Sequence, residues 1–185
     1  MAQISNLKKY CNCEAKMKKK IKISGIINES IVDGPGIRMV VFAQGCKHNC
    51  KGCHNKHTHS FEGGEYVDID KILNDLKNNF LLDGVTLSGG DPFEQAETFA
   101  ELAKEVKKTG KNVVTYTGYT FEQLIKYSSE RKGYKELLEN TDMLIDGPFI
   151  IEEKSLQLKF RGSKNQRIID VPKSIKNKKV VIAIE

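Results

Sequence analysis

The sequence predicts an α/β fold, a partial (incomplete) β/α barrel with a mainly parallel sheet. Short apolar runs alternate along the chain with segments of helical periodicity, which indicates βαβ units. Polar, turn-forming segments follow several predicted strands, as at the carboxyl edge of a parallel sheet. The chain has 185 residues, enough for one domain but fewer than the about 250 of a complete eight-stranded barrel.

The first predicted elements are two strands and a long loop. Residues 22–28 and 38–43 are short runs rich in apolar and β-branched side chains, which predicts strands. Asp33-Gly34-Pro35-Gly36 between them is typical of a turn. The segment from Gln44 to about Gly64 carries three of the five cysteines, and we expect it to be a loop.

Helices and a strand are expected next. Residues 68–80 have apolar side chains at helical spacing, so they predict a helix with one buried face. The β-branched run at 85–88 predicts a short strand. Asp91 is expected to cap a second helix that begins at Pro92 and ends at Gly110.

The C-terminal half continues the alternation. Residues 112–117 predict a strand, and Thr120 with Gln123 forms a capping box for a helix that runs to about residue 127. The remaining expected elements are a helix over 134–140 and strands over 143–145, 166–171 and 179–184.

We expect two parts in the chain: a basic N-terminal tail over residues 1–21, solvated and partly disordered, and a single domain over 22–185. The formal net charge is +6, from 30 Lys and Arg against 24 Asp and Glu, and many of the lysines lie near the N-terminus. A nucleic-acid arm needs stacking aromatics within such a run, and Tyr10 alone lies nearby. We therefore expect no nucleic-acid partner.

The composition favours the cytoplasm. Apolar residues make up 39% of the chain, and no apolar run approaches membrane-spanning length, so we expect no membrane association. The N-terminus lacks the apolar region of a secretory signal. Five cysteines, three of them within eight positions, fit a reducing compartment better than a disulfide framework.

The three crowded cysteines, Cys46, Cys50 and Cys53, have the spacing C-x3-C-x2-C. Three thiolates on one loop can hold three irons of a cubane cluster, which leaves the fourth iron open to a chelating substrate. Zinc is the alternative, because all four histidines of the chain lie within or just after this loop and one would complete a tetrahedral site. The spacing alone predicts a metal and leaves iron and zinc open.

Cys11 and Cys13 form a separate C-x-C pair in the basic tail. The pair is far in sequence from the other three cysteines. It is either a second metal or redox site or an incidental pair of tail residues.

Two further polar segments end neighbouring strands. Ser88-Gly89-Gly90-Asp91 follows one strand, and Thr115, Tyr116 and Thr117 end the next. Because the carboxyl ends of parallel strands share one edge, we expect these segments to meet the cysteine loop. Gly89 and Gly90 let backbone approach a ligand closely. The alternatives are a plain strand-to-helix turn with Asp91 only as its N-cap, and ordinary strand propensity for the threonines.

Taken together, five motifs in order resemble the radical S-adenosylmethionine superfamily, and more narrowly its glycyl-radical activating enzymes. The resemblance covers roughly residues 22 to 171. The motifs are the cysteine spacing, Asp33-Gly34-Pro35-Gly36-Ile37-Arg38, Ser88-Gly89-Gly90-Asp91-Pro92-Phe93, Thr115-Tyr116-Thr117-Gly118 and Asp146-Gly147-Pro148-Phe149. Gly52 stands where many members have an aromatic residue, so His54 is the expected stacking surface near adenine. Asp91 stands where the broader motif has Glu.

The resemblance implies an enzyme with one [4Fe-4S] cluster on Cys46, Cys50 and Cys53. It implies reductive cleavage of S-adenosyl-L-methionine to a 5′-deoxyadenosyl radical, which makes a glycyl radical on the large subunit of anaerobic ribonucleotide reductase. A low-potential donor such as flavodoxin or ferredoxin is the expected electron source. Alternative targets are another glycyl-radical enzyme or a small molecule, and the rival class is a zinc-stabilised binding module.

The same resemblance implies roles for individual residues beyond the cluster ligands. The carbonyls of Gly89 and Gly90 would accept from the methionyl amino group, and Asp33 and Arg38 would steer the partner's glycine loop. The expected cofactor-binding residues are Gly52, His54, Ser88, Gly89, Gly90, Asp91, Thr115 and Thr117.

Overall fold

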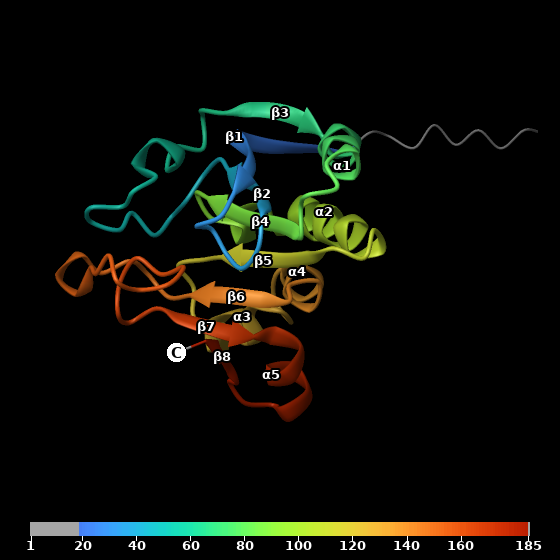
Figure 1. Cartoon of the computed structure of the whole chain (residues 1–185). Coiled ribbons are helices and arrows are strands. Elements are labelled where there is room, and N and C mark those ends of the chain that lie inside the picture. The colour runs from blue at the N-terminus through green and yellow to red at the C-terminus, as the bar shows by residue number, and fades with distance from the viewer. Residues whose placement is uncertain (1–18, 185) are drawn as a thin grey trace, which may run out of the picture.

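A computed structural model describes residues 19–184 and shows a mixed α/β fold built on one sheet (Figure 1). The strands are β1 (Lys20–Ser30), β2 (Arg38–Ala43), β3 (Glu65–Asp68), β4 (Gly84–Gly89), β5 (Asn112–Tyr116), β6 (Met143–Asp146), β7 (Arg167–Asp170) and β8 (Ile182–Ile184). Their order across the sheet is β3-β1-β2-β4-β5-β6-β7-β8. The predicted α/β class is confirmed.

The sheet is parallel only in its middle, so the expectation of a mainly parallel sheet is corrected. β2, β4, β5 and β6 pair in parallel, whereas the pairings that involve β1, β3, β7 and β8 are antiparallel. Parallel neighbours need a crossover, and helices supply it between β4 and β6. A short turn joins β1 to β2, and the connection from β6 to β7 contains no α-helix that crosses back over the sheet, so these neighbours run antiparallel. Within residues 19–184 the edge strands β3 and β8 do not pair with each other.

The helices pack on one face of this sheet. The α-helices are α1 (Ile69–Asn78), α2 (Ala96–Lys108), α3 (Phe121–Tyr127), α4 (Tyr134–Glu139) and α5 (Val171–Asn177), and the short 3-10 helices are η1 (Lys56–Thr58), η2 (Pro92–Gln95) and η3 (Ile151–Glu153). Buried side chains of all five α-helices join the strands in one hydrophobic core. In Figure 1 the long loops project from the opposite end of the strands from α1, α2 and α5.

Strand alternation decides which side chains face the helices. In β2, Met39 and Val41 belong to the helix-packed core, so Arg38 and Phe42 point to the other face. The other face carries a smaller apolar cluster around Val114. It is the face that remains for a functional site.

Arg38 is fully buried on this second face, and its guanidinium holds the Asp-Gly-Pro-Gly turn to the sheet. It donates to Thr86 Oγ1 at 2.7 Å, to Asn112 Oδ1 at 2.7 Å and to the carbonyl of Pro35 at 3.1 Å. Burial lowers the pKa of Arg38 to about 10, so it remains cationic at neutral pH. Thr86 in turn donates to the carbonyl of Asp33 at 2.8 Å.

Several expected elements are confirmed and some differ. The strand at 38–43 and the capping box of Thr120 and Gln123 are present as predicted. Asp91 accepts from the amide of Phe93, but it caps the 3-10 helix η2, and α2 begins at Ala96. β3 and α5 were not predicted. β3 is a four-residue edge strand without apolar alternation, and α5 lies within a segment whose flanking runs favour strands. Each helix in residues 19–184 is too short or too polar to span a lipid bilayer.

Replacing Arg38 tests the buried guanidinium. Arg38→Leu leaves Thr86 and Asn112 without their buried donor, and we expect it to lower the free energy of unfolding by about 3 kcal/mol. Arg38→Lys should recover part of that loss, since it restores the charge but not the fork of donors. Urea unfolding measures both, with exposed Lys71→Leu as the control. An Arg38→Leu midpoint equal to that of the control would contradict this role.

Candidate functional site

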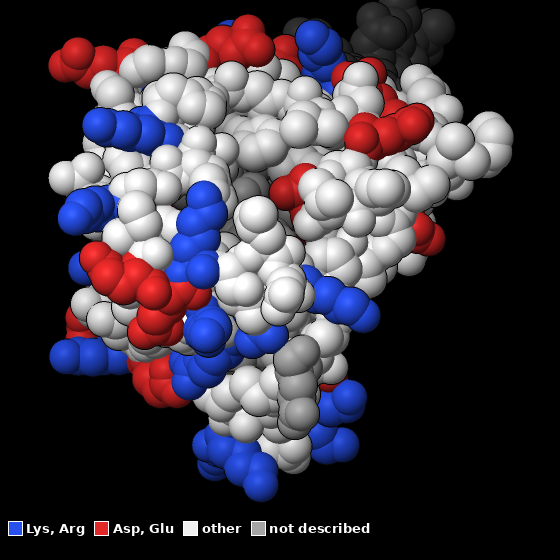
Figure 2. Space-filling view, turned by 60° about the vertical axis from the view of Figure 1, so that its left-hand side comes forward, with Lys and Arg blue, Asp and Glu red and all other residues white. Residues whose placement is uncertain are grey.

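A cavity of about 390 Å³ opens at the carboxyl ends of the parallel strands. Figure 2 shows a hollow in the middle of the face that carries the long loops, surrounded mainly by uncharged residues. The lining residues are Ile27, Asp33, Phe42, Cys46, His48, Cys50, Cys53, His54, Asn55, His59, Ser88, Gly89, Gly90, Tyr116, Thr117, Gly118, Gly147, Phe149, Gly162 and Gln166. The cavity therefore brings together the cysteine loop and the loops that follow β4, β5 and β6.

The cysteine loop is closed by its own returning segment. Gly45 donates to the carbonyl of Thr58 at 2.8 Å, and Cys46 donates to that of His59 at 3.0 Å. The amide of Cys53 donates to the carbonyl of Cys50 at 3.2 Å. This backbone bonding holds three half-buried free thiols toward one cavity.

Burial affects the ionisation of two of these thiols, those of Cys46 and Cys50. It raises the pKa of the Cys46 thiol to about 11 and also raises the pKa of Cys50. Both are therefore protonated at neutral pH until a metal replaces the protons. Three free thiols on one loop are a soft donor set that suits iron–sulfur clusters or zinc. Among residues 19–184, no three His, Cys, Asp or Glu side chains are grouped closely enough to hold a single metal ion.

The glycine pair after β4 lies backbone to backbone against the start of the cysteine loop. Gly89 has φ +95°, and a Cβ there would lie 2.6 Å from the amide nitrogen of Ala43. A Cβ on Gly90 would lie 2.3 Å from the carbonyl oxygen of Gly45. Both positions require glycine, and both line the cavity.

Asp91 is 1% exposed, and its carboxylate joins three segments of the cavity wall. Its Oδ2 lies 2.9 Å from His48 Nε2 and accepts from Thr117 Oγ1 at 2.8 Å and from the amide of Gly118 at 3.0 Å. Its Oδ1 accepts from the amide of Phe93 at 2.9 Å. A buried carboxylate needs such donors to offset its desolvation. Asp91 therefore ties the cysteine loop, through His48, to the turn after β5.

A second buried acid reinforces this tie. Glu94 forms an ion pair with Lys47 of the cysteine loop at 2.6 Å and accepts from the Tyr119 hydroxyl at 2.7 Å. The Tyr119 ring also packs edge-on against His48, with centroids 4.4 Å apart. Lys47 and His48, which are neighbours in the cysteine loop, therefore contact two different acids at η2, Glu94 and Asp91.

Four of the expected site residues lie outside the cavity wall, each for a physical reason. Thr115 points into the helix-packed face, where its hydroxyl bonds Thr141 at 2.8 Å, so we assign it to the core. Asp91 and Arg38 are buried and fully engaged by protein donors and acceptors. Gly52 has φ +73°, and a Cβ there would lie 2.6 Å from Ile151, so it permits close packing of two loops. Cys11 and Cys13 lie outside the described residues.

The remaining expected residues line the cavity together: Asp33, Cys46, Cys50, Cys53, His54, Ser88, Gly89, Gly90 and Thr117. Tyr116, which was expected with Thr115 and Thr117, lines it as well. His48, His59, Phe149 and Gln166 line it too and were not named as binding residues. Tyr116 and Thr115 point to opposite faces because successive side chains of a strand alternate, so only Tyr116 of the two reaches the cavity. Phe149 packs on His54, with centroids 5.4 Å apart, and nothing in the sequence indicates that contact.

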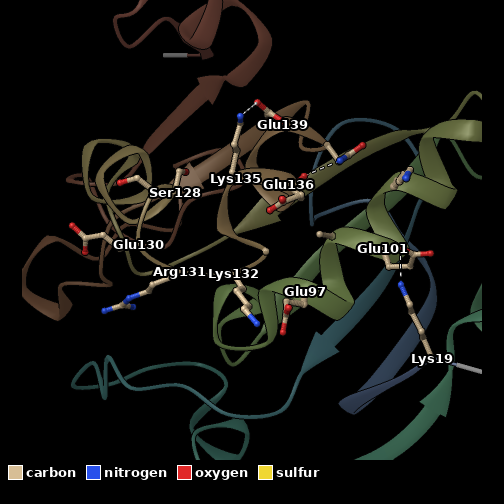
Figure 3. Close-up of a pocket in the computed structure, with 15 residues that line it drawn as sticks. Lys19, Glu97, Glu101, Ser128, Glu130, Arg131, Lys132, Lys135, Glu136 and Glu139 are labelled. Atoms are coloured by element: carbon tan, nitrogen blue, oxygen red, sulfur yellow. Dashed lines mark hydrogen bonds and ion pairs between the residues drawn. The ribbon is translucent and has the colours of Figure 1, made fainter. Parts of the chain in front are cut away.

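A larger groove of about 690 Å³ lies elsewhere, between α2 and the segment that joins α3 to α4 (Figure 3). Its wall is mostly charged, and some of these side chains pair with one another. Lys19 lies 3.1 Å from Glu101, and Lys135 lies 3.9 Å from Glu139. The groove contains none of the residues expected to be functional, and its pairs have the character of a solvated surface.

Comparisons with known proteins agree with a cluster site. Residues 32–169 match the family described as a 4Fe-4S single cluster domain. The anaerobic ribonucleoside-triphosphate reductase-activating protein of Haemophilus influenzae is 38% identical over 146 residues, which cover 75% of this chain and 90% of the relative. The protein of that name from Vibrio cholerae is 40% identical with the same coverage. The Escherichia coli K12 protein of that name is 33% identical over 144 residues, covering 74% of this chain and 90% of the relative.

A solved structure, QueE from Escherichia coli, is similar over 55% of this chain and 54% of its own, with 17% identity and a TM-score of 0.43. At that score the likeness carries no argument about this chain.

Asp91→Asn tests the carboxylate. The amide nitrogen would replace an oxygen that now faces three donors, so we expect unfolding free energy to fall by about 3 kcal/mol. We also expect less iron per chain after anaerobic reconstitution, because the cysteine loop loses its anchor. Exposed Asp75→Asn is the matched control. Wild-type iron content and stability in Asp91→Asn would contradict the anchoring role.

Gly118→Ala tests the same anchor from the other side. A Cβ at this position would lie 2.4 Å from the His48 ring and push it away from Asp91. We expect a loss of about 1–3 kcal/mol in stability together with weaker iron retention. Gly25→Ala is the control, because its Cβ would meet nothing within 4 Å. Equal iron retention by the two variants would mean that the His48 contact is dispensable.

Proposed function

The chain belongs to the family of anaerobic ribonucleoside-triphosphate reductase-activating proteins, and from this premise we propose how its residues perform the activation. It is an iron–sulfur enzyme that activates the anaerobic reductase. We propose that it does so by making a glycyl radical on the reductase's large subunit. The observation that carries this proposal is one cavity that holds all three cysteines of the loop opposite a glycine pair.

In this proposal Cys46, Cys50 and Cys53 hold a [4Fe-4S] cluster and leave one iron without a protein ligand. When bound, the cluster would supply one electron from the external donor to S-adenosylmethionine, which would give methionine and a 5′-deoxyadenosyl radical able to take a hydrogen atom from the partner's glycine. The chain's own part is to supply three thiolates on a loop whose ends are held together by backbone hydrogen bonds.

The opposite wall is proposed to bind S-adenosylmethionine. Ser88, Gly89 and Gly90 line the cavity at the end of β4, and the backbone carbonyls of the two glycines are proposed to accept from the methionyl amino group. His54 and Phe149 pack together at another part of the wall and offer an aromatic surface for adenine. Thr117 already donates to Asp91 and accepts from the amide of Tyr119, so we assign it a positioning role.

Asp33 is proposed to meet the partner, because it lines the cavity and is half-buried. Its carboxylate accepts from the Ser30 hydroxyl at 2.5 Å, which fixes its direction. Arg38 lies beneath this turn and acts only by holding it. The two residues therefore have separate roles in the proposal.

Four broader expectations belong to the same proposal. The electron donor is a low-potential protein such as flavodoxin or ferredoxin, because such clusters lie near −400 mV or below. The free cysteines support a reducing compartment, the cytoplasm. The open sheet with helices on one face supports an incomplete β/α barrel. We retain the division into a tail over 1–21 and a domain over 22–185, although β1 begins at Lys20.

Anaerobic reconstitution with iron and sulfide tests the function. With dithionite and S-adenosylmethionine we expect 5′-deoxyadenosine by chromatography, and with the anaerobic reductase a glycyl doublet by electron paramagnetic resonance. Cys50→Ala should lose both products, because only two loop thiolates remain.

A Cys11→Ser/Cys13→Ser variant is the control, and we expect it to retain iron and activity. An intact cluster that yields no 5′-deoxyadenosine would end the enzymatic proposal. Colourless protein with stoichiometric zinc and no sulfide would favour the zinc-stabilised module instead. Deoxyadenosine without a glycyl doublet would point to another radical target.

A further inference from the structure

The Asp146-Gly147-Pro148-Phe149 turn begins the loop that leads from β6 to β7. This loop and the cysteine loop extend from the same end of the strands (Figure 1). They are in direct contact. The Phe149 ring packs on His54, with centroids 5.4 Å apart. A Cβ on Gly52 would lie 2.6 Å from the Ile151 side chain, so the backbone of the cysteine loop passes close against the other loop.

A hydrogen bond to a cysteine sulfur is a further contact between the two loops. The backbone amide of Phe149 donates to the sulfur of Cys50. The sulfur of Cys46, by contrast, accepts from the amides of His48 and Asn49, which belong to its own loop. Burial raises the pKa of Cys50, and the Phe149 amide opposes that rise because a donor stabilises the thiolate. One expected cluster ligand is therefore bonded to a segment far along the chain.

The backbone on either side of Phe149 is bonded elsewhere. The carbonyl of Pro148 accepts from Asn165 Nδ2 at 2.8 Å. The amide of Ile150 donates to Ser163 Oγ at 3.2 Å. Both neighbours of Phe149 are thus held by the returning half of their own loop, whereas the Phe149 amide bonds the cysteine loop.

Gln166 holds the start of the same turn, and its side chain also lines the cavity. Its Nε2 donates to the carbonyl of Gly147 at 3.1 Å. Its Oε1 accepts from the amides of Gly162 and Ser163, at 2.9 Å and 3.2 Å. Gln166 therefore joins the two ends of the loop and fixes the direction in which the turn presents its next amides.

We propose that the Phe149 amide tunes the reduction potential of the cluster through its hydrogen bond to the Cys50 sulfur. This inference rests on the proposed function, in which Cys50 is a ligand of the cluster. Reduction adds negative charge to the cluster and its thiolates, so a donor on a ligating sulfur stabilises the reduced state more than the oxidised state. The amide therefore raises the potential and eases electron uptake from the external donor. Gln166 is a positioning residue, since it acts only through the turn that carries this amide.

Pulsed electron paramagnetic resonance tests the hydrogen bond itself. Protein made with ¹⁵N-labelled phenylalanine is reconstituted anaerobically, reduced, and measured without S-adenosylmethionine. We expect a ¹⁵N coupling to the reduced cluster of the wild type and its loss in Phe149→Leu, whose amide nitrogen carries no label. The proposal is wrong if the wild type shows no such coupling or if Phe149→Leu retains it.

A redox titration of the loaded cluster, also without S-adenosylmethionine, measures the consequence. Phe149→Pro removes the amide hydrogen, and we expect its midpoint potential to shift to more negative values. Phe149→Leu keeps the amide and loses the ring, so its midpoint should equal that of the wild type. Gln166→Ala should shift the midpoint in the same direction as Phe149→Pro. Exposed Gln157→Ala, in the same loop, is the control for Gln166→Ala.

Wild-type midpoints in both Phe149→Pro and Gln166→Ala, with the cluster loaded, would overturn the proposal. An equal shift in Phe149→Leu would do the same, because the ring would then set the potential. If Phe149→Pro takes up no iron, Gln166→Ala and the labelled spectra still decide. A loaded wild-type cluster that yields no 5′-deoxyadenosine would refute the proposed function and leave these measurements standing, so the two failures are distinguishable.

Discussion

The buried carboxylate of Asp91 is the interaction on which the rest of the site depends. It accepts from Thr117 and from the amides of Gly118 and Phe93, and it lies within hydrogen-bond distance of the ring of His48. These groups come from the cysteine loop, the turn after β5 and the start of η2. A charge removed from water this completely is stable only while its partners stay in place, so it fixes their relative positions. Asp91 therefore holds the cysteine loop in position, although Asp91 itself does not line the cavity.

Much of the fold could be predicted from local pattern, and much of the site could not. The strand at 38–43, the capping box and the convergence of the strand-end loops all followed from sequence periodicity and turn chemistry. The flanking antiparallel strands did not, because strand direction depends on long-range pairing. Thr115 was expected in the cavity together with Tyr116 and Thr117, yet it lies on the other face, since successive side chains of a strand point to opposite faces. Arg38 showed no sequence sign of burial, because its partners are far along the chain.

The cysteine loop shows how little the spacing of cysteines alone says about which metal they bind. Its three thiols predict a metal, and the four nearby histidines left iron and zinc equally open. Membership of the family identifies the metal centre as an iron–sulfur cluster rather than zinc. The structure adds that backbone and aromatic groups line the same cavity as the three thiols.

The most direct test of this account is the electron paramagnetic resonance spectrum of the reduced, reconstituted full-length protein, recorded with and without S-adenosylmethionine. The account predicts a [4Fe-4S]⁺ signal whose g-values shift when S-adenosylmethionine is added, because one iron has no cysteine ligand and accepts the substrate. A cluster signal that S-adenosylmethionine leaves unchanged, with the cluster fully loaded, would contradict it.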